Sequence, residues 1–124
     1  IRYFLPHMMQ NLEGRIINIS SIASFKGNIG QVGYSSTKSA LNGMIKSLAL
    51  ETARFNITVN NILPGFIESD MTENLASKSL LKKKIPLRRF GKPEEIASVT
   101  KFLLSPDSGY LTGQNLIIDG GLSC

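Results

Sequence analysis

The sequence has little cysteine, no tryptophan and no long apolar run, and two of these absences exclude a class of protein. Its single cysteine, Cys124, is the last residue, so no disulfide can form within the chain, and a reducing compartment is the natural expectation. No apolar stretch approaches the roughly 18 residues that a membrane-spanning helix needs, so no membrane protein is predicted. The remaining composition, with 42% hydrophobic and 19% charged residues, is ordinary for a globular chain of 124 residues.

Acidic residues are outnumbered, but the excess positive charge lacks the pattern of a nucleic-acid-binding protein. The net charge is +5, and the densest basic cluster is Lys82–Lys84, with Arg88 and Arg89 close behind. No helix-turn-helix, zinc-ligand or aromatic RNA-binding pattern accompanies this cluster. A solvated basic face is the first interpretation of the cluster, and a surface that attracts an acidic protein partner is the second.

Apolar residues recur with two different periods, which predicts alternating strands and helices. Residues 15–21 form an apolar run typical of a buried strand, and residues 57–63 alternate and are rich in β-branched side chains. A long helix is expected over residues 32–54 between them. Its apolar positions at helical spacing are Leu41, Met44, Ile45, Leu48 and Ala49. Two strands joined by a long helix predict a parallel crossover unit of an α/β fold.

Shorter elements flank this unit. Residues 3–12 indicate the end of an amphipathic helix that contains Pro6 and stops at Gly14. Residues 93–104 begin with a proline followed by two glutamates, which is a favourable helix start. Residues 116–118 are expected to form a last short strand. The whole chain has the length of one domain at most.

The loop between the first strand and the long helix contains Gly27, Gly30 and Gly33, spaced as G-x-x-G-x-x-G. A dinucleotide-binding fingerprint needs a closer first pair of glycines and an acidic residue suited to a ribose hydroxyl, and neither is present. We interpret these glycines as residues that let the loop fold over a site.

Three residues inside predicted elements need an explanation. Gly43 costs the long helix about 1 kcal/mol relative to alanine, which indicates either a close neighbouring backbone, such as that of another subunit, or a tolerated weakness. Asn60 and Asn61 lie at the buried end of the second strand and need hydrogen-bond partners. Packing and local hydrogen bonding are the simplest explanation for both.

The most informative stretch is residues 32–40, where Tyr34 and Lys38 follow Ser21 by thirteen and seventeen residues. Residues four apart lie on one face of a helix, so the phenol and the ammonium are expected to share one site. A nearby cation favours the phenolate, which suits the tyrosine to acid–base work near neutral pH. Ser21 ends a strand, where open parallel sheets place their ligands, and its hydroxyl can hold a substrate oxygen. The tyrosine–lysine pair alone also occurs by chance on amphipathic helices.

The combination of these residues resembles the short-chain dehydrogenase/reductase family. The residues that carry the resemblance are Ser21, Tyr34, Lys38, Asn60, Pro64-Gly65 and Asp119-Gly120-Gly121. It covers essentially the whole chain and is closest to the branch that reduces 3-oxoacyl groups on acyl carrier protein. The resemblance implies the carboxyl-terminal half of a Rossmann-type doubly wound parallel sheet, with residues 1–124 as a partial domain.

The resemblance also implies hydride transfer between NADP(H) and a carbonyl or alcohol. Tyr34 then donates the proton, Ser21 hydrogen-bonds the carbonyl oxygen, and Lys38 supports the tyrosine and holds the nicotinamide ribose. The cofactor-binding residues that it implies are Tyr34, Lys38, Pro64, Gly65, Ile67 and Ser69. The choice of NADP over NAD is inferred from the branch alone, and no metal ligand is implied.

A substrate linked to acyl carrier protein and a homotetramer are implied by the same resemblance. Residues 91–95 and 119–121 are then subunit-contact or scaffold features. Arg54 and the cluster from Lys82 to Arg89 are the candidate contacts to the carrier protein. The expected compartment is the cytoplasm in a bacterium, or a plastid or mitochondrion in a eukaryote.

The polar stretch over residues 69–84 is expected to form a mobile helical lid over the substrate. Met71, Leu75 and Leu80-Leu81 are its interspersed apolar residues. Lids of this kind exclude water from the reacting groups and gate turnover.

The family's glycine-rich phosphate loop, its adenine-side residues and the asparagine of its catalytic set are expected to precede Ile1. We therefore expect an incompletely represented reductase with a raw sheet edge and little turnover of its own. Two hypotheses stay open. The chain is either the catalytic half of an NADP-dependent reductase or a truncated, inactive chain that acts only as a subunit-interaction module. The intact set of Ser21, Tyr34 and Lys38 favours the first.

Overall fold

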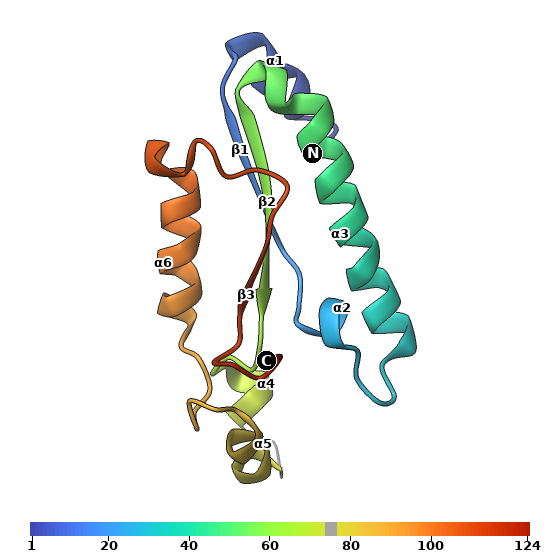
Figure 1. The fold of residues 1–124 in the computed structure, drawn as a ribbon, viewed down its shortest axis with the longest axis vertical. Helices are drawn as coiled ribbons and strands as arrows, with labels where there is room; N and C mark the ends of the chain where they lie inside the picture. The colour runs from blue at the N-terminus through green and yellow to red at the C-terminus, as the bar shows by residue number, and fades with distance from the viewer. Residues whose placement is uncertain (74–76) are drawn as a thin grey trace.

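The computed structural model describes residues 1–73 and 77–124, and the strands in these residues form one parallel sheet of three strands (Figure 1). The strands lie in the order β1 (Gly14–Ile19), β2 (Ile57–Pro64) and β3 (Asn115–Ile118). Gly14 of β1 pairs with Ile57 of β2, and Asn61 of β2 pairs with Asn115 of β3. The strands alternate with helices, so the predicted α/β class and the parallel crossover unit are confirmed.

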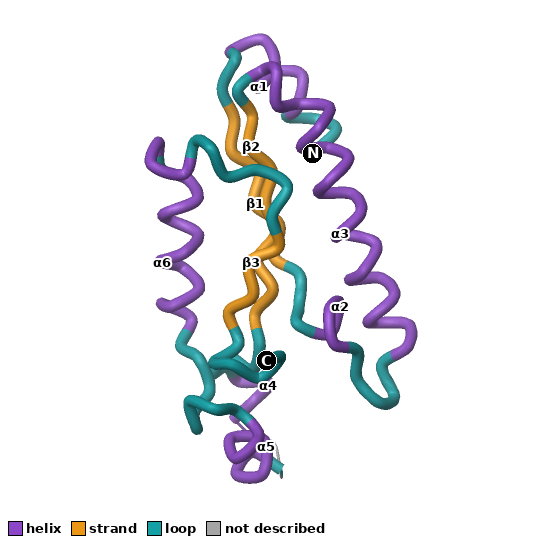
Figure 2. Tube along the Cα trace, viewed as in Figure 1, coloured by secondary structure: helices purple, strands orange, loops and turns teal. Residues whose placement is uncertain are grey.

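Helices cover both faces of the sheet. The helical segments are α1 (Leu5–Asn11), α2 (Ala23–Lys26), α3 (Val32–Thr52), η1 (Ala53–Phe55), α4 (Asp70–Glu73), α5 (Lys78–Lys84), α6 (Pro93–Leu104) and η2 (Pro106–Ser108). Helix α3 packs against β2, and α6 packs against β1 and β2 from the other side (Figure 2). Helices α4 and α5 lie beyond the carboxyl ends of the strands (Figure 1). No helix in the described ranges is long and apolar enough to span a membrane.

The hydrophobic core lies between α3 and β2. Ile45 and Ala49 of α3 pack on Ile57 and Val59 of β2, and all four side chains are buried. Residues 57–63 of β2 are buried throughout, because helices cover both faces of this central strand. The apolar–polar alternation noted in this strand therefore does not correspond to one buried and one solvated face.

Strand β1 is less buried than its apolar sequence predicted. Only Gly14 is fully buried, and Ile19 is 47% exposed. The reason is position, because β1 pairs with β2 alone and forms one edge of the sheet. The prediction of a buried strand was wrong in this respect.

Helix α1 ends for a reason other than the predicted one. Pro6 lies in its first turn, where the missing N–H group costs nothing. Leu12, not Gly14, ends the helix by adopting a left-handed conformation with φ of 53°. Gly14 instead begins β1, and a Cβ atom there would lie 2.9 Å from the sulfur of Met8. This glycine is explained by close packing under the helix.

The remaining elements follow the expectations closely. Helix α6 has the predicted bounds, and the carboxylate of Glu95 accepts a hydrogen bond from the N–H group of Lys92 at 2.7 Å, which caps the helix. The predicted lid contains the two short helices α4 and α5, and its mobility stays a prediction. Leu75 of that lid lies outside the described residues.

Candidate active site

Tyr34 and Lys38 lie one turn apart in the first half of α3, as their spacing predicted. The Nζ atom of Lys38 is 5.8 Å from the centroid of the Tyr34 ring, within the range of a cation–π contact. Tyr34 is 48% exposed, and Lys38 is half-buried beside it. The pair therefore presents a phenol to the surroundings with a positive charge held against its ring.

Ser21 lies just past the carboxyl end of β1, in a segment that stays in register with β2. The N–H groups of Ser20 and Ile22 donate to the carbonyl oxygens of Ile62 and Pro64 at 2.8 and 2.9 Å. The Oγ atom of Ser21 accepts a hydrogen bond from the N–H group of Ala23 at 3.2 Å. That bond uses an oxygen lone pair, so the hydroxyl proton of Ser21 is left to donate to a substrate oxygen.

Polar contacts fix the segment around Ser21 on α3. The Oγ atom of Ser20 donates to the carbonyl oxygen of Lys38 at 3.3 Å, and the Oγ atom of Ser39 donates to the carbonyl oxygen of Ser24 at 2.8 Å. The two bonds join Ser20 and Ser24, which flank Ser21 in the sequence, to Lys38 and Ser39 of α3. The segment that contains Ser21 is therefore held against α3 at Lys38 and Ser39, and α2, which follows Ser21, also packs on α3.

The glycines before α3 have the conformation that a tight loop requires. Gly27 and Gly30 adopt positive φ angles of 71° and 78°, where a side chain is strained. No neighbouring atom would meet a Cβ atom at Gly27, Gly30 or Gly33. Backbone conformation therefore explains the first two glycines. The loop also contains the short helix α2, which the sequence did not predict.

A network of side-chain amides supports this site from within the sheet. Asn61 of β2 is fully buried, and its Nδ2 atom donates to Asn42 Oδ1 at 2.9 Å and to Asn115 Oδ1 at 3.0 Å. Its Oδ1 atom accepts from Asn18 Nδ2 at 2.7 Å. Asn42 also donates to the carbonyl oxygen of Ser24 at 3.5 Å, which links the network to the Ser21 segment. The network joins all three strands to α3.

The sequence predicted that the two central asparagines need partners but did not identify those partners. Asn60 donates to the carbonyl oxygen of Leu111 at 2.7 Å and accepts from the N–H group of Gln114 at 3.1 Å. Asn60 therefore positions the loop before β3, and Asn61 holds the amide network. The signal that was available is the recurrence of asparagine in the strands, at Asn18 and Asn115.

Pro64 is the last residue of β2 and Gly65 follows it, at the carboxyl end of the sheet, where Ser21 also lies. The N–H group of Gly65 donates to the carbonyl oxygen of Ile118 at 2.9 Å. A Cβ atom at Gly65 would lie only 2.7 Å from the Cβ atom of Asp119, which follows β3. Close packing between the two strand ends thus explains this glycine within the chain, and its predicted role toward a cofactor stays a prediction.

Ile67 and Ser69 lie farther along the same loop, which is held by its own contacts. Ile67 bridges to Gly91 in parallel fashion, and the N–H group of Glu68 donates to the carbonyl oxygen of Gly91 at 2.8 Å. The hydroxyl oxygen of Thr72 accepts from the N–H group of Ser69 at 2.9 Å. These contacts hold residues 67–72 against Gly91, just before α6.

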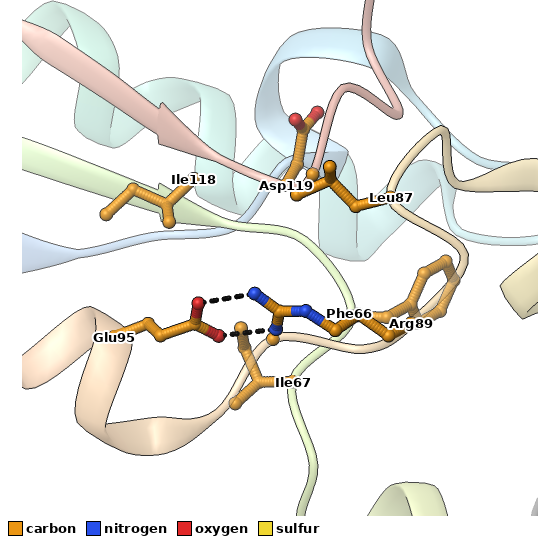
Figure 3. Close-up of a pocket in the computed structure, with 9 residues that line it drawn as sticks. Phe66, Ile67, Leu87, Arg89, Glu95, Ile118 and Asp119 are labelled. Carbon is orange, nitrogen blue, oxygen red and sulfur yellow. Dashed lines mark hydrogen bonds and ion pairs between the residues drawn. The ribbon is translucent and has the colours of Figure 1, made fainter.

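A cavity of about 90 Å³ lies behind this loop, and it is separate from the Tyr34 site (Figure 3). Two hydrogen bonds of 2.7 and 2.6 Å join the guanidinium of Arg89 to the carboxylate of Glu95 at its edge. The bond from Arg89, followed by the N–H bond from Lys92, lowers the pKa of Glu95 from 4.5 to about 2. The same ion pair raises the pKa of Arg89. The predicted subunit-contact or scaffold role of residues 91–95 stays a prediction.

The residues of the Tyr34 site fit the nicotinamide end of a dinucleotide cofactor. Lys38 is half-buried, and in the described part of the chain the single ion pair is Arg89–Glu95, so the Lys38 ammonium has hydrogen-bond donors left for a ligand. The backbone at Pro64 and Gly65 lies at the same end of the sheet. Across residues 1–73 and 77–124, no group of three or more His, Cys, Asp or Glu side chains is placed to hold a metal ion.

Comparison with known proteins identifies the family. Residues 1–123 match the family described as enoyl-(acyl carrier protein) reductase. A 3-oxoacyl-[acyl-carrier-protein] reductase of Aquifex aeolicus is 50% identical over 120 residues, which cover 95% of this chain and 48% of the relative. Carbonyl reductase family member 4 of Xenopus laevis is 52% identical over 118 residues, which cover 95% of the chain and 49% of the relative.

A third relative has a different substrate in its name. An acetoacetyl-CoA reductase of Synechocystis is 47% identical over 125 residues, which cover 97% of this chain and 51% of the relative. The chain spans about half the length of the curated relatives it matches. Its three parallel strands and alternating helices correspond to the carboxyl-terminal half of a Rossmann-type sheet. The chain therefore belongs to the short-chain dehydrogenase/reductase family, as the sequence predicted.

Proposed function

We propose that this chain is the catalytic half of an NADPH-dependent reductase that converts a 3-oxoacyl group on acyl carrier protein into the 3-hydroxyacyl group. The observation that carries the proposal is the Lys38 ammonium, held 5.8 Å from the ring of Tyr34. The name of the Aquifex aeolicus relative supplies the substrate class. In this role the chain serves the elongation of fatty acids.

Tyr34 acts as the general acid in the proposed reaction. As the carbonyl carbon accepts a hydride, negative charge develops on the carbonyl oxygen, and the Tyr34 hydroxyl donates its proton there. The products are the alcohol and a phenolate. Because Tyr34 is 48% exposed, water can return the proton to the phenolate.

Lys38 stabilises the charge that Tyr34 acquires. Its ammonium lies 5.8 Å from the centroid of the tyrosine ring, so it attracts the negative charge that develops on the phenol oxygen. The same ammonium has donors to spare for a ribose hydroxyl of the cofactor.

Ser21 orients the substrate. Its Oγ atom already accepts a hydrogen bond from the N–H group of Ala23. The hydroxyl proton of Ser21 is therefore available to donate a hydrogen bond to the substrate. A hydrogen bond from Ser21 to the carbonyl oxygen holds that oxygen near Tyr34 and stabilises its developing charge.

The cofactor contacts are proposed on the same side of the sheet. Lys38, Tyr34 and the backbone from Pro64 to Ser69, including Gly65 and Ile67, hold the nicotinamide end. When bound, NADPH supplies the hydride.

A homotetramer is part of the proposal. Gly43 lies on the exposed side of α3, and in residues 1–73 and 77–124 no atom within 4 Å would meet a Cβ atom there, so the backbone of this part of the chain does not explain the glycine. A neighbouring copy packed on α3 would explain it. Gly43→Trp is then expected to lower the mass measured by light scattering in solution, and an unchanged mass would contradict this assignment of α3.

The direct test of the function is turnover by the purified protein. Acetoacetyl-acyl carrier protein and NADPH are mixed with the protein, absorbance at 340 nm is followed, and the product is identified by mass spectrometry. The intact mass is measured first, because this chain alone (13.6 kDa) is expected to turn over little. For protein of about twice that mass, we expect loss of absorbance with formation of the 3-hydroxybutyryl product, and folded protein of this larger mass that oxidises no NADPH would contradict the proposal. A mass near 13.6 kDa without NADPH oxidation would favour the alternative of an inactive subunit-interaction module.

A further inference from the structure

Positive charge is concentrated in one short segment of this chain. Six of the fourteen lysines and arginines lie between residues 78 and 89, without an acidic residue among them. The rest of the chain carries eight basic and nine acidic residues. The whole positive net charge of the protein therefore originates from this segment.

Four of these side chains line one hollow between α5 and the turn that follows it. We define them as the basic patch: Lys78, Lys82, Lys83 and Arg88. Ser79, which also lines the hollow, adds a hydroxyl group. Arg89 does not belong to the patch, because its guanidinium is engaged by Glu95.

The geometry of the patch is set by a buried aromatic ring. Phe90 is fully buried, and the Nζ atoms of Lys78 and Lys82 lie 6.0 and 5.5 Å from its ring centroid. Lys78 and Lys82 are one helical turn apart and half-buried, so their ammonium groups are brought to the same face of α5. Phe90 in turn stacks on Phe66, with 5.5 Å between ring centroids.

Arg88 closes the hollow from the other side. It adopts a left-handed backbone conformation with φ of 55°, and its guanidinium donates to the carbonyl oxygen of Lys83. A non-glycine residue in this conformation is uncommon. The turn therefore directs a cationic side chain back toward the last turn of α5.

Stabilisation of the helix end does not account for this arrangement. Lysines in the last turn of a helix favour its carbonyl end, which explains part of the Lys82–Lys84 run. Lys78 is the first residue of α5, at the end where a cation is unfavourable. Among the described residues the patch has no carboxylate partner, because Arg89–Glu95 is the single ion pair there.

The patch lies toward the same end of the sheet as the Tyr34 site. Helices α4 and α5 follow the carboxyl end of β2, and the start of α3, which contains Tyr34, lies toward that end as well (Figure 1). Thioesters of acyl carrier protein and of coenzyme A, the substrates named for two relatives, share a phosphopantetheine arm. That arm carries a phosphate at the end remote from the thioester.

We propose that the basic patch of Lys78, Lys82, Lys83 and Arg88 binds the phosphate of this phosphopantetheine arm. The proposal rests on the thioester-reductase function proposed above. The ammonium groups and the Arg88 guanidinium supply charge-assisted hydrogen bonds to phosphate oxygens. The reacting carbonyl then lies at the far end of the arm, toward Tyr34.

The test is an NMR titration of the ¹⁵N-labelled protein with phosphopantetheine and, in parallel, with pantetheine, which lacks the phosphate. We expect phosphopantetheine to bind about tenfold more tightly at low salt, with shift changes at residues 78–90, and the advantage to fall in 1 M salt. Lys82→Gln/Lys83→Gln should remove most of that advantage. Lys83→Gln alone preserves both lysine contacts with Phe90 and should remove part of it.

Lys101→Gln is the matched control, because it removes one exposed lysine from α6. It should leave the preference for phosphopantetheine unchanged. Equal affinity for the two ligands, or shift changes away from residues 78–90, would overturn the proposal.

Further arms distinguish the source of the phosphate and separate this proposal from the reductase function. If Lys82→Gln/Lys83→Gln weakens the binding of both coenzyme A and holo-acyl carrier protein, the two ligands share a phosphate contact. Apo-acyl carrier protein has no phosphopantetheine arm. If the same variant weakens the binding of the apo-carrier to the same degree, the patch contacts the surface of the carrier protein, and the phosphate assignment is wrong. Tyr34→Phe should bind phosphopantetheine with the affinity of wild type, because Tyr34 is not part of the basic patch. The binding test therefore gives a result even if the protein has no reductase activity.

Discussion

The two halves of α3 belong to one continuous helix, but the second half packs in the hydrophobic core and the first half carries the candidate catalytic residues. In the second half, Ile45, Ala49 and Thr52 are buried, and the first two pack on β2. In the first half, Tyr34 is half-exposed, and the helix is held to the Ser21 segment by hydrogen bonds from small polar residues. Stability and the proposed chemistry are thus separated along a single helix.

The sheet shows the same division. At its amino-terminal end, Ile57 and Val59 of β2 belong to the hydrophobic core. Nearer its carboxyl end, Asn61 has three amide partners, Pro64 is the last residue of β2, and Ser21 follows β1. Apolar packing fixes one end of the fold, and directional hydrogen bonds fix the end where a substrate is expected. Changes in one region should therefore leave the other largely intact.

Ile45→Ala should produce the largest change in stability. Ile45 is fully buried in the core, so the truncation removes apolar contacts and leaves a cavity. We expect the free energy of unfolding, measured with urea, to fall by about 2–5 kcal/mol. The activity per folded molecule should stay within about twofold of wild type, and a loss of activity greater than the loss of folded protein would break the proposed separation.

Lys38→Ala should have the opposite profile. Removing the ammonium beside Tyr34 is expected to lower kcat about 100-fold, while the urea midpoint stays close to that of wild type. Lys46→Ala is the matched control, because Lys46 is an exposed lysine two turns farther along α3. If both variants keep full activity, Lys38 has no part in the reaction.

Asn61→Ala should reduce stability by a smaller amount than Ile45→Ala. The substitution leaves Asn18, Asn42 and Asn115 without their shared partner inside the sheet. We expect a loss of about 1–3 kcal/mol in the free energy of unfolding. Because Asn42 also contacts the Ser24 carbonyl, kcat should fall modestly as well. Unchanged stability would show that the amide network is not needed to hold the strands.

The smallest effect is expected at Glu95. The Arg89 guanidinium holds the pKa of Glu95 near 2, below its ordinary value of 4.5. Its contribution to stability is therefore present above about pH 4.5 and is lost as the pH falls through about 2. Glu95→Gln should lose this part of the pH dependence and unfold at a slightly lower temperature at pH 7. Identical acid unfolding curves for variant and wild type would contradict this role.

The sequence predicted most of the fold because its strongest signals are local. Helix α6 has the predicted bounds, since Pro93 and Glu95 supply its start. Strand β1 was expected to be buried, but burial depends on which strands neighbour it, and that information is not local. The end of α1 was assigned to Gly14 because a glycine is the usual signal, whereas Leu12 adopts the left-handed conformation.

The candidate site was predictable only in part. The spacing of Tyr34 and Lys38 predicted their contact, because both lie in one helix. The hydrogen bonds that hold the Ser21 segment on α3 depend on Ser20, Ser24 and Ser39, which carry no distinctive pattern in the sequence. Likewise, the buried asparagine at position 61 signalled a need for partners, but only the packing of three strands identifies them.

The most direct test of the central claim is the rate of NADPH oxidation by Tyr34→Phe beside wild type, with circular dichroism and urea unfolding measured on the same samples. The substitution removes one hydroxyl from a half-exposed side chain and leaves the ring against Lys38. We predict a loss of at least about 100-fold in kcat with an unchanged unfolding curve. Near-wild-type turnover by the folded variant would contradict the assignment of Tyr34 as the proton donor.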